Sequence, residues 1–72
     1  MKIYNYTNDL GTRKFIFISE IKGTDAEFRY SIYTERDGVP CDFCGEGIMT
    51  RNKLNEFLKH YKDIVEVKEA ES

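Results

Sequence analysis

Residues 27–38 read Glu-Phe-Arg-Tyr-Ser-Ile-Tyr-Thr-Glu-Arg-Asp-Gly, and their pattern is the clearest indication of secondary structure in the chain. Its side chains alternate: Phe28, Tyr30 and Ile32 form one set, and Glu27, Arg29, Ser31 and Glu35 form the other. A period of two is typical of a strand with one buried face. Asp37-Gly38 is a dipeptide favoured in two-residue hairpin turns. The stretch therefore predicts a strand that ends in a hairpin, with the next strand beginning at Val39.

Two more strands are predicted before this one, at residues 2–7 and 13–22, separated by the turn-rich residues 8–11. The second of them is apolar on both faces, with Phe15, Phe17 and Ile21 on one and Ile16 and Ile18 on the other. This pattern indicates a central strand, or a face kept for a partner. After the hairpin, Pro40 has no N–H to donate, so we expect an edge strand or an irregular loop there.

A helix is predicted from Arg51 to about Asp63, with Thr50 as its N-cap. Its core-facing stripe is expected to comprise Leu54, Phe57, Leu58, Tyr61 and Ile64 or Val65. The expected fold class is α+β, a four-stranded antiparallel sheet followed by one C-terminal helix packed on one face. We expect a single domain over residues 1–65 and a frayed polar tail over 66–72, although 65–67 is an alternative short strand.

The chain has 72 residues, and its 13 acidic and 11 basic side chains give a net charge of −2. No apolar run is long enough to span a membrane, and no apolar leader follows Met1, so we expect a cytoplasmic protein. This length offers little room for a catalytic cleft, and no catalytic motif occurs. We therefore expect a binding protein and not an enzyme.

The acidic residues are concentrated in the middle of the chain, where residues 25–50 hold six acidic and two basic side chains. The acidic set comprises Asp25, Glu27, Glu35, Asp37, Asp42 and Glu46. Such a set can bind a basic protein surface, or it can be a solvated face that keeps a small protein soluble. The first interpretation makes these six residues the predicted partner-binding set.

Cys41 and Cys44 are the only cysteines and lie three residues apart, a spacing used to bring two thiolates onto one metal ion. Two thiolates favour zinc, and a structural zinc site needs four ligands. His60 is the obvious third ligand. Asp63 is the predicted fourth ligand, with Glu56, Asp42 or water as alternatives. The competing interpretation is that both cysteines are reduced, small packing residues.

From Arg13 to about Ile64 the order of elements resembles the PC4-like family of single-stranded DNA-binding proteins. The matching segments are Arg13-Lys14-Phe15, Ile21-Lys22-Gly23, Asp37-Gly38 and Gly47-Ile48-Met49-Thr50. The resemblance implies a sheet surface that binds single-stranded DNA, here with Tyr30, Arg29 and Arg13. The family's basic glycine loop is replaced by Gly45-Glu46-Gly47, so DNA binding is the alternative function.

A small acidic chain of strands and one helix is also similar in type to phage and mobile-element inhibitors of host defence. Among these are small anti-CRISPR proteins that bind Cas9, and the residues carried over are the possible ligands Cys41, Cys44 and His60. The resemblance implies a non-enzymatic inhibitor, stapled by zinc, whose acidic surface blocks a nucleic-acid-handling partner such as Cas9 in the cytoplasm of a bacterial host. This is the function that we expect from the sequence.

Overall fold

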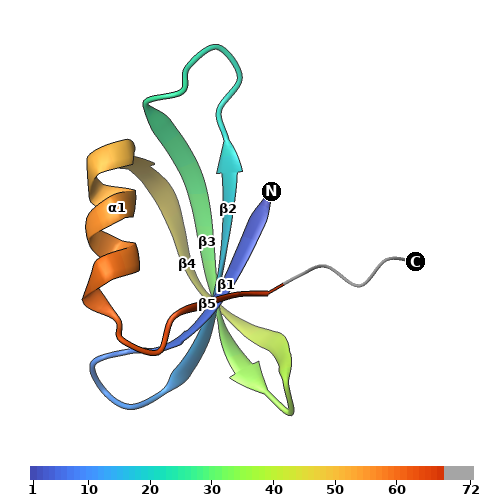
Figure 1. Ribbon diagram of the computed structural model, residues 1–72. Helices are drawn as coiled ribbons and strands as arrows, with labels where there is room; N and C mark the ends of the chain where they lie inside the picture. Colours follow the sequence, from blue (N-terminus) through green and yellow to red (C-terminus); the bar gives the residue numbers. More distant parts are fainter. Residues whose placement is uncertain (68–72) are drawn as a thin grey trace.

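Residues 1–67 are described by a computed structural model and form five strands and one helix. The elements are β1 (Lys2–Thr7), β2 (Arg13–Glu20), β3 (Glu27–Arg36), β4 (Val39–Thr50), α1 (Arg51–His60) and β5 (Val65–Val67). The strands form one antiparallel sheet in the order β4-β3-β2-β1-β5, and α1 packs on one face of it (Figure 1). The α+β class is confirmed, with five strands in place of the predicted four.

The extra strand is β5, which pairs with β1 through Ile3 and Val67 and through Asn5 and Val65. The predicted tail of residues 66–72 therefore begins inside a strand, and residues 68–72 lie outside the described residues. Three residues are too few for a periodic pattern to separate a strand from a tail. Their pairing depends on the outer edge of β1, whose partner residues lie 60 to 64 positions earlier in the chain.

The predicted turn and cap are confirmed by the local geometry. Asp37 and Gly38 have φ values of 56° and 81°, the positive values that a type I′ hairpin turn requires. At the start of α1, the Thr50 hydroxyl accepts a hydrogen bond from the Lys53 backbone N–H at 3.2 Å. The helix ends at His60, three residues earlier than predicted, because Tyr61 is already extended.

The core lies between α1 and the face of the sheet that this helix covers, which we call the helix-side face. Its buried residues are Tyr6, Ile16, Ile18 and Phe28, and Leu54, Phe57, Tyr61 and Ile64 pack against them. The Tyr6 ring centre lies 5.1 Å from that of Phe57 and 4.6 Å from that of Tyr61. Most of the predicted helix stripe is thus confirmed. Val65 is instead 56% exposed.

β2 is the central strand, as its two apolar faces predicted, and β4 is an edge strand, as Pro40 predicted. The opposite face of the sheet carries no second layer within residues 1–67 (Figure 1). No helix in this part of the chain has the length and apolar character needed to cross a membrane.

Candidate functional site

The face of the sheet opposite α1, which we call the open face, is defined by a series of register partners. Asn5 pairs with Phe15, Phe15 with Tyr33, and Tyr33 with Phe43. Directly paired residues of an antiparallel sheet project from the same face. These side chains therefore belong to one surface, which crosses β1 to β4.

An aromatic row crosses the open face from the centre of the sheet to its edge. The ring centres of Phe17 and Tyr33 are 5.4 Å apart, and those of Tyr33 and Phe43 are 5.6 Å apart, both pairs packing edge to face. Phe17 and Tyr33 are half-buried, whereas Phe43 is 57% exposed. Aromatic side chains of this kind are enriched at protein interfaces.

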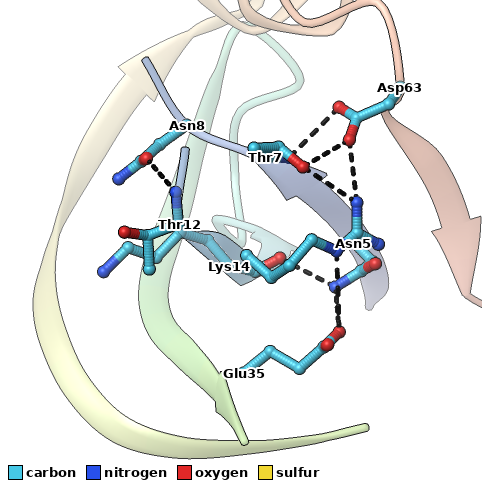
Figure 2. A network of polar contacts seen from close by, with 8 residues as sticks. Asn5, Thr7, Asn8, Thr12, Lys14, Glu35 and Asp63 are labelled. Atoms are coloured by element: carbon cyan, nitrogen blue, oxygen red, sulfur yellow. Dashed lines mark hydrogen bonds and ion pairs between the residues drawn. The ribbon is translucent and has the colours of Figure 1, made fainter. Parts of the chain in front are cut away.

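A polar network lies beside this row and holds the Glu35 carboxylate in place (Figure 2). Asn5 is buried, and its Nδ2 donates to the Lys14 carbonyl at 3.0 Å and to Glu35 Oε1 at 2.8 Å. Arg13 Nε lies 3.9 Å from the same Glu35 oxygen. Glu35 is therefore part of the polar framework of the sheet and is not a free acidic contact.

Asp63 connects the turn after α1 to the start of the sheet (Figure 2). Its carboxylate accepts from the Thr7 hydroxyl at 2.6 Å, from the Thr7 N–H at 3.1 Å and from Arg13 Nη1 at 2.8 Å. The hydrogen bonds from Thr7, with the Arg13 charge, hold the pKa of Asp63 below its ordinary value. This predicted zinc ligand is thus engaged in a structural contact.

The two cysteines occupy β-bulges in β4 and lie on opposite faces of the sheet. Cys44 is the extra residue between the register pairs formed by Gly45 and Phe43, and Cys41 is the extra residue between those formed by Asp42 and Pro40. Cys41 lines a hollow of the open face with Phe17 and Tyr33. Cys44 instead contacts helix-side residues.

Cys44 Sγ has a positively charged and a hydroxyl neighbour. Lys14 Nζ and Thr34 Oγ1 each lie 3.1 Å from the sulfur. Lys14 Nζ also donates to Thr34 Oγ1 at 2.9 Å, which leaves the hydroxyl proton of Thr34 free to point at the sulfur. The hydrogen bond from Thr34, followed by that from Lys14, lowers the pKa of the Cys44 thiol.

The remaining predicted zinc ligands do not join the cysteines. His60 Nε2 lies 3.1 Å from Asp9 Oδ1, Asp42 is bound to Arg36 at 2.9 Å, and Glu56 lies 3.9 Å from Lys53 Nζ. Among residues 1–67, no three His, Cys, Asp or Glu side chains form a group suited to a metal ion. The described arrangement does not bring both thiols to one ion, so the zinc site stays a prediction.

The six predicted partner-binding acids do not form one patch. Glu27, Glu35 and Glu46 lie on the open face by register, whereas Asp42 pairs with Thr34 on the helix-side face. Asp25 precedes β3 and Asp37 follows it, so these two residues lie at opposite ends of a ten-residue strand. Only part of the acidic set can therefore contact one partner surface.

The three residues expected to bind DNA are also divided. Tyr30 is half-buried on the helix-side face, where its hydroxyl lies over Gly47. Arg13 is paired with Asp63 and Glu35, and Arg29 is exposed on the open face. The charged residues of the open face are Arg13, Arg29, Glu27, Glu35 and Glu46. Two basic and three acidic side chains do not make the basic surface that binds a phosphate backbone.

A hollow of about 500 Å³ on the helix side is lined mainly by apolar residues, with Thr50 and a single charged residue, Lys53. It contains no acid, histidine or thiol among its lining residues. Comparisons with protein families, with curated proteins and with solved structures found no match for this chain.

Sequence reasoning did not identify the aromatic row as a site. The signal was partly present, because Phe15 and Phe17 occupy the second apolar face of β2. The position of Phe43 beside Tyr33 could not be predicted from the sequence, because it depends on the register shift at the Cys44 bulge. The burial of Asn5 could not be predicted either, because the strand at residues 2–7 shows no pattern that distinguishes this position.

Proposed function

We propose that this protein is a non-enzymatic inhibitor that binds a nucleic-acid-handling protein through its open face. The observation that carries the proposal is the aromatic row, which reaches 57% exposure at Phe43 on a sheet face with no second layer in residues 1–67. Exposed aromatic surface of this kind is a mark of protein interaction sites.

The charges of the open face support a basic partner. Glu46 lies on that face in register with Ser31, is exposed, and has no cation within ion-pair distance among the described residues. Glu27, also exposed, lies further along the same face. These carboxylates provide the charge complementarity that steers association with a basic rim.

Cas9 loaded with guide RNA is the partner to test, by measuring cleavage of target DNA at increasing concentrations of this protein. We expect inhibition that falls at least tenfold with Phe43→Ala and several-fold with Glu46→Gln. Asp42→Asn is the matched control, because this acid lies on the other face, and it should inhibit like the parent protein. Absence of inhibition by the parent protein would contradict the Cas9 proposal.

The alternative function, binding of single-stranded DNA, is tested with a labelled oligonucleotide. Its fluorescence anisotropy is followed at two salt concentrations as this protein is added. We expect no binding. Binding that weakens steeply with salt would favour phosphate contacts and the DNA-binding alternative.

A further inference from the structure

The outer edge of β4 is the longest exposed backbone edge in the described part of the chain. β4 pairs with β3 from Val39 to Thr50, and no strand of residues 1–67 pairs with its other side. The opposite edge of the sheet, β5, has only three residues. A free edge presents unpaired N–H and C=O groups to any strand that can align with it.

The features that block strand addition are confined to the first half of β4. Pro40 and both bulges lie within residues 39–44, and prolines and bulges are the usual protection of an edge. Residues 45–50 contain no proline and keep a continuous register with β3. This half therefore offers six regularly spaced residues for pairing.

The side chains of this segment are compatible with pairing to itself. By register its open-face positions are Glu46, Ile48 and Thr50. Ile48 is 57% exposed, and the Thr50 hydroxyl caps α1. An antiparallel pair centred on Ile48 places the two isoleucines opposite each other, and each Glu46 opposite the Thr50 of the other copy. A register centred on Glu46 would bring two carboxylates together, which is destabilising. Of these two registers, the segment favours the one centred on Ile48, by charge and by apolar burial.

We propose that β4 pairs with β4 of a second copy of this chain, about a two-fold axis at Ile48, and so extends the sheet from five strands to ten. The contact is isologous, because the same segment is used by both copies. The axis runs through the sheet from face to face, so both open faces lie on the same side of the dimer. This inference goes beyond the proposed function and does not depend on which partner the open face binds.

Sedimentation equilibrium over a micromolar to sub-millimolar range tests the proposal. We expect the parent protein to approach twice its mass of 8.5 kDa and Ile48→Lys to stay monomeric. Val65→Lys is the matched control, because Val65 is an exposed aliphatic residue of the other edge strand, at 56% against 57% for Ile48. This control should dimerise like the parent protein. A monomeric parent protein at every concentration would overturn the proposal.

Disulfide trapping tests the register independently of stability. In a Cys41→Ser, Cys44→Ser background, Ile48→Cys should form a covalent dimer on mild oxidation, because paired Cα atoms lie about 4.5–5.5 Å apart. Glu46→Cys should not cross-link with itself in the same background. A dimer that cross-links efficiently only through Glu46→Cys, or one that survives Ile48→Lys, would contradict the assigned register. Inhibition of Cas9 is measured independently of the mass and the cross-linking of the dimer. Failure of the dimer proposal can therefore be distinguished from failure of the proposed function.

Discussion

Cys41 and Cys44 are both exposed free thiols, three residues apart, and the fold gives them opposite surroundings. Cys44 has the Lys14 ammonium and the Thr34 hydroxyl at 3.1 Å, whereas the Cys41 sulfur has the Asp42 carboxylate at 3.7 Å. A cation and a hydroxyl donor favour a thiolate, and a carboxylate does not. The two cysteines therefore provide an internal comparison of thiol reactivity.

We expect Cys44 to be alkylated by iodoacetamide several-fold faster than Cys41 at neutral pH. Its lowered pKa leaves a larger thiolate fraction, and the thiolate is the nucleophile. Thr34→Val and Lys14→Met should each raise the pKa of Cys44, so the pH at which its alkylation rate is half-maximal should move upward. Quantitative mass spectrometry of the peptides that contain each cysteine gives both rates in one sample.

Cys41 serves as the control in each variant, because neither Lys14 nor Thr34 contacts it. Its alkylation rate should be the same in the parent protein and in both variants. Equal rates at the two cysteines in the parent protein, or a Cys44 profile that is insensitive to both substitutions, would contradict the described contacts of the Cys44 sulfur.

The two glycines of β4, Gly45 and Gly47, differ in what surrounds them. A Cβ at Gly47 would lie 2.8 Å from the Tyr30 hydroxyl oxygen and 3.0 Å from Cζ, whereas one at Gly45 would meet nothing within 4 Å. The Tyr30 ring thus packs directly on the backbone of β4 at Gly47. This contact is available only where the strand lacks a side chain.

We expect Gly47→Ala to lower the free energy of unfolding by about 1–3 kcal/mol, because the Tyr30 ring must move. Gly45→Ala is the matched control in the same strand and on the same face. It should be neutral or raise the free energy of unfolding by up to about 1 kcal/mol, since alanine loses less entropy than glycine. Urea denaturation of the two variants gives the comparison, and equal effects would contradict the contact.

The elements that sequence could predict are those whose signals are local. The Asp37-Gly38 turn, the Thr50 cap and the two apolar faces of β2 each depend on neighbouring residues, and each is confirmed. The fifth strand and the early end of α1 depend on distant partners. β5 (Val65–Val67) forms by pairing with the edge of β1. Asp63, which was predicted to end the helix, instead accepts a hydrogen bond from the Thr7 hydroxyl.

The candidate site was less predictable for the same reason. The spacing of Cys41 and Cys44 suggested one shared ion, but the face on which each thiol lies is set by two bulges against β3. A register shift of one residue reverses the face of a side chain. Sequence spacing alone does not contain that information, so neither the separation of the cysteines nor the alignment of Phe43 with Tyr33 could be predicted.

Residues 1–67 form a sheet with two unlike faces, and this difference is the basis of our proposal that the open face binds a partner. On the helix-side face Phe28 is buried at 7% exposure under the Arg51 guanidinium. On the open face Phe15 is buried at 6% exposure in the central strand, whereas the aromatic row ends towards the sheet edge in Phe43 at 57% exposure. Apolar area that stays in contact with water contributes little to folding.

We therefore expect Phe28→Ala and Phe43→Ala to differ sharply in stability. Phe28→Ala should lower the free energy of unfolding by about 3–5 kcal/mol, the range for a truncated buried phenylalanine. Phe43→Ala should lower it by at most about 1.5 kcal/mol, the contribution of its edge-to-face contact with Tyr33. Guanidinium denaturation measures both. If Phe43→Ala cost as much as Phe28→Ala, the row would be part of the core. If Phe43→Ala lowers the free energy of unfolding only slightly, the variant stays folded. A loss of partner binding in this variant then reports the loss of the contact between Phe43 and the partner.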